Sequence, residues 1–277
     1  MLFQRLIWCA LAVALVLGSA QSLLQRLQTV PLIQAAEVFE AQNEARSEAH
    51  EAAVPHAHAE GTPAHSHEAV HEAAHEHGGD AWSPAEGLER TGWTWVANVM
   101  HAFSMALLAL AAMGLWTWRR GGRTGPFRLA FAVAGAGWLS LHLWPSLGLP
   151  AEVPGMEAAA LGARQAWWVL AMASSAAACA TVAFGTRRWR FAVAAVLMAL
   201  PFAVGAPQHA GDALAAFSGD AHDRMAALAR QFVWATTWLS LSFWALMGLA
   251  CALVYPRWLK PVLATSGPAA SPEAMAA

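Results

Sequence analysis

The sequence predicts an all-α integral membrane protein: a bundle of six transmembrane helices, or five if the first is cleaved, with a disordered histidine-rich loop outside the cytoplasm. Hydrophobic residues make up 57% of the 277 residues and charged residues only 12%, whereas about a quarter of a soluble domain is charged. Runs of 18 or more mostly apolar residues, long enough to cross a bilayer, recur along the chain. A soluble helical protein is excluded because so many apolar runs leave too few polar residues to cover them.

The first predicted span also has features of a signal peptide. Arg5, the apolar run after it and the small residues at 18–20 resemble a secretory leader. The apolar run continues to Leu24, which makes it long enough to cross the membrane, so we expect the span to be retained. The six predicted spans are residues 6–24, 93–118, 129–147, 165–184, 190–206 and 231–254.

Charge predicts the orientation of these spans. Lysine and arginine collect on the cytoplasmic side of membrane proteins. Ten of the sixteen basic residues flank one set of span ends, which carries a single acid, Glu273, while the other ends carry all remaining acids. Both termini are therefore predicted to be cytoplasmic, and the acidic loops periplasmic if this is a bacterial inner membrane. The ten basic residues are Arg5, Arg119, Arg120, Arg123, Arg128, Arg187, Arg188, Arg190, Arg257 and Lys260.

The segments between and after the spans divide the chain further. Residues 1–24 form the first span, and residues 25–49, with glutamates at helical spacing, are expected to form an extracytoplasmic helix bent near Pro31. Residues 50–80 form the histidine-rich loop and residues 81–260 a five-span membrane domain. The Pro/Ala/Ser-rich residues 261–277 are expected to be a disordered cytoplasmic tail.

The histidine-rich loop is the strongest indication of function. It interleaves imidazoles with carboxylates, the ligands preferred by borderline divalent ions such as Co²⁺, Ni²⁺ and Zn²⁺, and it contains no Cys or Met for Cu(I). We predict metal binding; the alternative is a low-complexity linker without ligands. Eight of the chain's twelve histidines lie here: His50, His56, His58, His65, His67, His71, His75 and His77.

The same loop contains a match to a zinc-protease motif. Residues 71–75 read HEAAH and fit the pattern H-E-x-x-H, but residues 67–71 fit it too. Such overlap is expected from composition alone in a His/Glu/Ala-rich tract. A membrane metallohydrolase is therefore a weak alternative, and we predict no enzymatic activity.

Histidines inside spans indicate a second metal site, because ionisable groups are rare in membranes and often functional there. His101 lies in the second span and His142 near the end of the third. Together they are predicted to receive ions from the loop, although each could instead be a hydrogen-bonded packing residue. In the last acidic loop, His209 with Asp212, and His222 with two nearby aspartates, are further possible ligands or merely solvated polar residues.

A weak internal repeat links two spans on the acidic side. Residues 163–168 read ARQAWW and residues 229–234 read ARQFVW, and the preceding hairpins end in similar Gly-x-Pro sequences. Glu157 precedes Arg164 by seven residues, as Asp223 precedes Arg230. Helical spacing predicts two charge pairs that form a charged vestibule; the alternative is arginines that snorkel to lipid headgroups.

Several functions are excluded or unsupported. There is no phosphate-binding loop motif, and Lys260 is the only lysine, so the chain has no ATP-binding motif of its own. Cys9, Cys179 and Cys251 lie within spans without CxxC spacing, which favours simple packing roles. The lipid bilayer is a predicted partner, and no nucleic-acid partner is predicted.

Five stretches carry a family resemblance, in this order: TVPLIQAAEVFE, WSPAEGLERTGWTWVANV, LHLWPSLGLPAEVPGMEAAALGARQAWW, PFAVGAP and ARQFVWATTW. In them the chain resembles the CbtA family of probable cobalt transporter subunits, over almost its whole length to about residue 260. The resemblance implies cobalt import, five membrane spans and a small one-span partner, CbtB, with histidines of its own. No residue selects cobalt over nickel or zinc, and nitrogen and oxygen ligands intrinsically favour nickel.

The leading hypothesis is therefore a subunit of a membrane transporter for divalent transition metals, with cobalt as the ion that the resemblance favours. The histidine-rich loop would capture metal, and the bundle would conduct it. The alternative is a metal sensor or buffer whose spans only anchor the loop.

Overall fold

The computed structural model describes residues 2–53, 84–85 and 87–265, and within these ranges helices joined by irregular loops are present and there is no strand. The predicted all-α class is confirmed. The helical elements, including two π-helical segments labelled η, are α1 (Leu2–Gln28), α2 (Val30–Ala53), α3 (Leu88–Arg120), α4 (Pro126–Trp138), η1 (Leu139–Leu143), α5 (Trp144–Ser146), α6 (Leu161–Phe184), α7 (Arg190–Val204), α8 (Asp220–Val254), η2 (Tyr255–Leu259) and α9 (Lys260–Thr265).

Four helices in the described ranges are long and apolar enough to cross a membrane: α1, α3, α6 and the continuous helix that begins with α8 and extends to Leu263. The predicted count of six spans is not confirmed. The predicted span 190–206 corresponds to α7, which has only 15 residues. The predicted span 129–147 coincides with a helical run from Pro126 to Ser146 that η1 divides into α4 and α5.

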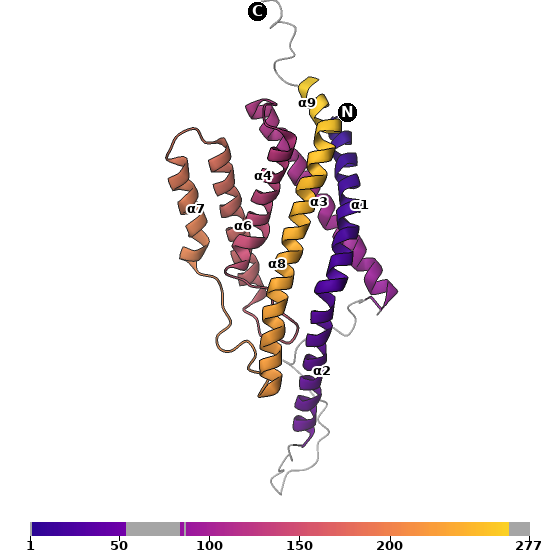
Figure 1. The fold of residues 1–277 in the computed structure, drawn as a ribbon. Coiled ribbons are helices and arrows are strands. Elements are labelled where there is room, and N and C mark those ends of the chain that lie inside the picture. Colours follow the sequence, from indigo (N-terminus) through magenta and orange to yellow (C-terminus); the bar gives the residue numbers. More distant parts are fainter. Residues whose placement is uncertain (1, 54–83, 86, 266–277) are drawn as a thin grey trace, which may run out of the picture.

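The core of the bundle lies between α1, α3, α4 and α8 (Figure 1). Its buried residues are largely small, which lets neighbouring helix backbones approach closely, as is usual in membrane bundles. The buried cluster contains alanines from three helices: Ala10 and Ala14 of α1, Ala102 and Ala106 of α3, and Ala134 of α4.

Gly137 of α4 lies directly against the ring of Trp244 of α8, so closely that a Cβ at position 137 would overlap the ring. We expect Gly137→Ala to lower the free energy of unfolding by about 1–3 kcal/mol, because the buried Trp244 has no space into which to move. Thermal unfolding in detergent measures this. Gly135→Ala, two residues earlier on the same helix, is the matched control, since a Cβ there meets nothing within 4 Å. Equal losses in both variants would contradict the close packing of α4 on α8.

Helices α6 and α7 form a hairpin beside this core (Figure 1). Two indole N–H groups donate to carbonyls of α7. Trp144 of α5 donates to the carbonyl of Met198 at 3.0 Å, and Trp167 of α6 to that of Pro201 at 2.9 Å. At the other end of α6, Arg120 of α3 donates to the last two carbonyls of the helix, at 3.0 Å each. Both ends of α6 are therefore tied to other parts of the bundle.

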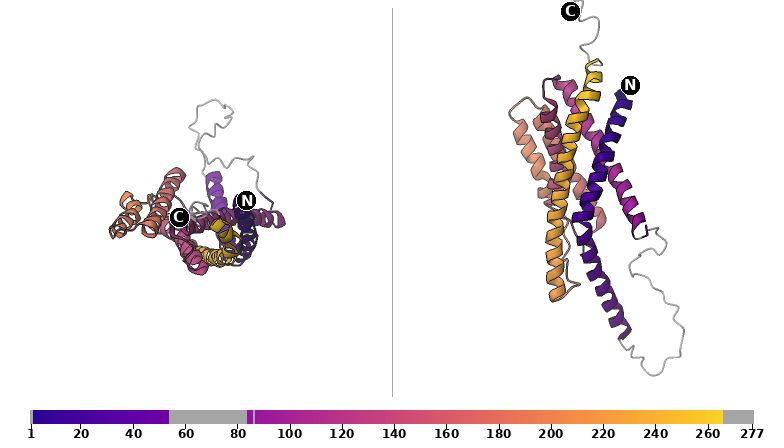
Figure 2. Two further views of the ribbon diagram at one scale, coloured as in Figure 1. Left: turned by 90° about the horizontal axis from the view of Figure 1, so that it is seen from above. Right: turned by 45° about the vertical axis from the view of Figure 1, so that its right-hand side comes forward.

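The two ends of the bundle differ in charge. N- and C-terminal segments lie at one end (Figures 1 and 2), where Arg5 approaches the carbonyl of Trp258 and Lys260 that of Gly122. The ten basic residues that were predicted to flank the cytoplasmic ends of the spans belong to the helix ends and short loops found here. At the opposite end lie α2, the loops 147–160 and 205–219, and the beginning of α8. Helices α1 and α2 are separated only by Thr29, two residues before Pro31.

Candidate functional site

At the acidic end, two loops and α8 enclose a pocket of about 400 Å³, here called the vestibule. The loops 147–160 and 205–219, which carry the two similar hairpin sequences, meet there. Gln208 donates to the carbonyl of Gly148 at 3.2 Å, and the backbone N–H of Glu157 donates to the carbonyl of Ala213 at 2.9 Å. The third wall is the α8 segment that contains Arg230 and Trp234.

Helix α2 is attached to the back of these loops. Ala36 is buried in a second apolar cluster with Val153, Leu214, Phe217 and Met225, which come from both loops and α8. Burial of such apolar side chains is favourable by about 1.5–3 kcal/mol each. The helix that leads into the histidine-rich loop is thus held against the vestibule.

The vestibule contains one histidine–carboxylate pair. Nε2 of His209 lies 2.9 Å from Oε2 of Glu157, with 28% and 50% of their side chains exposed. A second acid, Glu152, is engaged by Arg164 at 2.6 Å. Because Arg164 compensates Glu152, the imidazole and carboxylate of the first pair are the groups best placed to bind a cation.

The predicted pair between Glu157 and Arg164 is wrong. Helix α6 begins only at Leu161, so Glu157 lies in the preceding loop and not two helical turns before Arg164. The loop instead turns Glu157 toward His209 and brings Glu152 to the arginine. Sequence reasoning missed Glu152, since no local spacing indicates a partner that a loop positions.

Next to the vestibule, His222 of α8 contacts two aspartates. Its Nε2 lies 2.9 Å from Asp212 and its Nδ1 lies 3.7 Å from Asp223. The backbone N–H of Leu214 and the ring of His222 hold the pKa of the Asp212 carboxyl below its usual value. Asp212, expected beside His209, is therefore an ionised partner of His222 instead.

His142 lies in the π-helical segment η1, a kind of irregularity often found at functional sites. Its ring stacks on Trp138, one turn earlier, with centroids 6.5 Å apart. Nε2 of His142 and Nε1 of Trp138 are both buried without a hydrogen-bond partner in the part of the chain that the structure describes. An unpartnered buried nitrogen costs free energy, so a ligand that pairs with it would be favoured there.

His101 has different neighbours. Its ring contacts Phe243 of α8, with centroids 5.3 Å apart, and its side chain is exposed on the surface of the bundle. No contact joins it to His142 within the described ranges, where no three His, Cys, Asp or Glu side chains converge as a metal centre. A site shared by His101 and His142 stays a prediction.

Most of the histidine-rich loop lies outside the described residues. His50 belongs to the last turn of α2, whereas His56, His58, His65, His67, His71, His75 and His77 fall in residues 54–83. Metal binding by this loop stays a prediction from the sequence.

A protein-family model with the description "Probable cobalt transporter subunit (CbtA)" matches residues 3–256, from α1 into η2. No curated protein and no solved structure matches the chain.

Proposed function

Because the chain belongs to the CbtA family of probable cobalt transporter subunits, we propose that it imports divalent transition-metal ions, with Co²⁺ the first candidate and Ni²⁺ or Zn²⁺ possible alternatives. Family membership and the long apolar helices make it a multi-pass membrane protein. In keeping with the family's description as a transporter subunit, transport without enzymatic activity is the function we propose.

The orientation follows from charge. The positive-inside rule assigns the basic end, with both termini, to the cytoplasm, and the vestibule and histidine-rich loop to the outside, the periplasm of a bacterial inner membrane. In this orientation metal ions meet the loop first. The docking of α2 on the vestibule then keeps the captured ions close to the entrance of the bundle.

The observation that carries the proposal is the His209–Glu157 pair in the vestibule. Imidazole and carboxylate are ligands of Co²⁺, Ni²⁺ and Zn²⁺. Two such ligands in neighbouring positions of an octahedral ion, each at ~2.1 Å, lie about 3 Å apart, close to the observed 2.9 Å between Nε2 and Oε2. An ion could bind between the two groups with little movement and complete its coordination with water, which suits a site that must also release it.

Farther into the bundle, His142 offers the next nitrogen donor, because its buried Nε2 has no partner among the described residues. We assign His101, about halfway along α3, to the same path as a later and weaker contact. We propose that the energy comes from a partner, an ion gradient or the metal gradient itself, and that the partner is a small one-span CbtB-like subunit, in keeping with the family's description as a subunit.

The proposal is tested by uptake of radioactive cobalt into cells that express the chain alone or with a CbtB-like partner. Saturable uptake that equimolar nickel and zinc do not block is expected. Partner dependence would assign the chain to a two-subunit transporter. No uptake in either setting, despite correct membrane insertion, would contradict transport and favour a metal sensor or buffer.

The histidine-rich loop has a separable role in this proposal. If all seven histidines between residues 54 and 83 are replaced with asparagine, we expect the cobalt concentration for half-maximal uptake to rise several-fold while the maximal rate stays unchanged. The reason is that the loop raises the local ion concentration and does not form the path. Initial rates over a range of cobalt concentrations measure both quantities; a lower maximal rate would place the loop within the path.

A further inference from the structure

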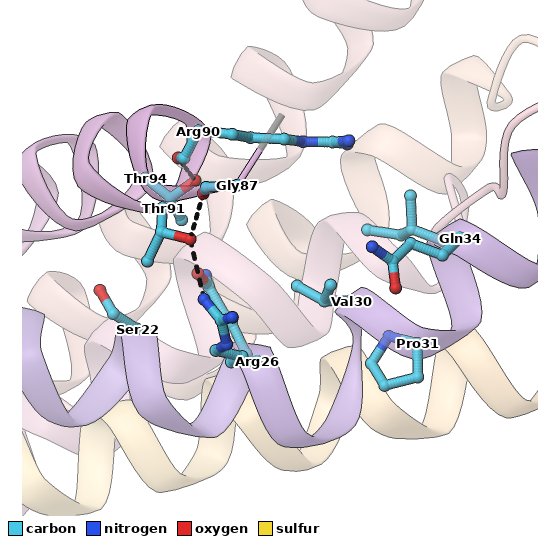
Figure 3. A pocket seen from close by; sticks show the side chains of 11 residues that line it. Ser22, Arg26, Val30, Pro31, Gln34, Gly87, Arg90, Thr91 and Thr94 are labelled. Carbon is cyan, nitrogen blue, oxygen red and sulfur yellow. Dashed lines mark hydrogen bonds between the residues drawn. The ribbon is translucent and has the colours of Figure 1, made fainter. Parts of the chain in front are cut away.

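A second pocket, of about 310 Å³, lies between the α1–α2 junction and the first turns of α3 (Figure 3). Polar side chains line most of it: Ser22, Gln25 and Arg26 of α1, Gln34 of α2, and Arg90, Thr91 and Thr94 of α3. Nothing in the transport path described above uses this pocket.

Two guanidinium groups dominate its charge. Arg26 donates to the hydroxyl of Thr91 at 2.8 Å, which in turn donates to the carbonyl of Gly87 at 2.8 Å (Figure 3). Arg90 reaches Glu37 of α2 at 3.1 Å. None of the described lining residues is acidic. Glu37 balances part of the charge of Arg90, so the guanidinium of Arg26, which has no acidic partner among the described residues, is the main group that opposes a metal cation and favours an anion here.

The depth of the pocket identifies the source of that anion. The predicted spans 6–24 and 93–118 end at its lining residues, which places it at the membrane–water boundary of the acidic end. The surrounding surface is apolar and exposed: 62% of Leu23, 68% of Leu27 and 51% of Trp93 are accessible. Tryptophan and leucine at this level are typical of contacts with lipid headgroups and acyl chains.

We propose that this pocket binds the phosphate of an anionic phospholipid. The guanidinium groups are suited to phosphate oxygens, and the Gln34 amide can donate to the rest of the headgroup. The acyl chains lie along Leu23 and Leu27. The bound lipid joins the α1–α2 junction to the start of α3, the two elements that flank the histidine-rich loop. This site does not depend on the proposed transport function.

The test is native mass spectrometry of the full-length protein released from nanodiscs that contain equal amounts of phosphatidylglycerol and phosphatidylcholine. Retention of phosphatidylglycerol is expected for the unmodified protein, and about tenfold less retention for Arg26→Gln, since one charge-assisted hydrogen-bonding group is lost. Arg46→Gln is the matched control, because it removes the same charge from α2 at a residue outside the pocket. Equal losses in the two variants would overturn the site.

A second variant keeps both arginines. Gln34→Trp fills the pocket with an indole, and Gln34 makes no hydrogen bond that the substitution would break within the described ranges. Loss of phosphatidylglycerol with unchanged thermal unfolding is expected, and full retention would overturn the proposal. In lipid-free detergent, inorganic phosphate is titrated against the protein. Binding of phosphate together with failure to retain phosphatidylglycerol would identify a soluble anion as the ligand and overturn the lipid assignment.

Discussion

Gly18→Ala is expected to force α1 away from α3 and to destabilise the protein more than any other single methyl addition considered. A Cβ at position 18 would lie 2.6 Å from the Cα of Val99 and 2.8 Å from its backbone nitrogen. Backbone atoms cannot rotate out of the way, so the helices must separate. We expect a loss of about 3 kcal/mol, or roughly 6 °C or more in the midpoint of thermal unfolding in detergent.

The same separation would disturb polar contacts one and two turns farther along the interface. Asn98 donates to Ser22 at 3.0 Å and to Gln25 at 2.7 Å, and Gln25 donates back to Asn98 at 3.2 Å. These hydrogen bonds contribute about 0.6 kcal/mol each on average in a membrane, so their loss adds to the steric cost.

Gly92→Ala in α3 is the control for Gly18→Ala, because a Cβ there meets nothing within 4 Å. We expect it to be neutral or slightly stabilising, since alanine favours helix over glycine by up to about 1 kcal/mol. If Gly18→Ala unfolds at the same temperature as Gly92→Ala, then α1 is not packed on α3 as the structure has it.

The second large effect is expected on uptake. His209→Ala and Glu157→Gln should each raise the cobalt concentration for half-maximal uptake by about tenfold or more, a loss comparable to those seen at metal sites. Each variant removes one of the two groups that we propose as ligands in the vestibule. Combining both should cost little more than either alone, because one ligand without the other already abolishes the site. Initial uptake rates at limiting cobalt measure the effect.

His222→Ala and Asp212→Asn form the matched control. Their pair has the same chemistry and the same 2.9 Å separation, but neither residue lines the vestibule. We expect both variants to transport cobalt nearly normally. If Glu157→Gln and Asp212→Asn reduce uptake equally, metal entry depends on the overall negative charge of these loops and not on the His209–Glu157 pair.

Residue composition and periodicity were sufficient to predict the structural class of the protein. Long apolar runs predicted helices, and α1, α3, α6 and α8 are those helices. The separation of ten basic residues from seventeen acids predicted two unlike ends, and the helix order places the ten basic residues at one end of the bundle and the acids among the described residues at the other. These features follow from local sequence, because helix formation and the length needed to span a membrane depend on neighbouring residues.

Local sequence was insufficient to predict how the helices of the third and fifth predicted spans are divided and how long they are. Apolar residues predominate through 129–147 and 190–206, so composition did not mark the π-helical segment at Leu139–Leu143, although the Gly205-x-Pro207 sequence does follow directly on the end of α7 at Val204. Packing accounts for the difference: the η1 segment lies against α6 and α8, and the indoles of Trp144 and Trp167 attach to α7 carbonyls.

The sequence by itself therefore determined a helical membrane protein with a basic end, an acidic end and a histidine-rich loop, since each depends on residues close together in the chain. Only the tertiary structure decided which charged groups meet. Glu157 pairs with His209, 52 positions later, and Arg164 with Glu152, because two loops of irregular path cross at the vestibule. Arg26 and Arg90 likewise share a pocket because α1 packs along α3. Such pairings depend on how distant backbones pack and on the paths of loops, and no local periodicity specifies either.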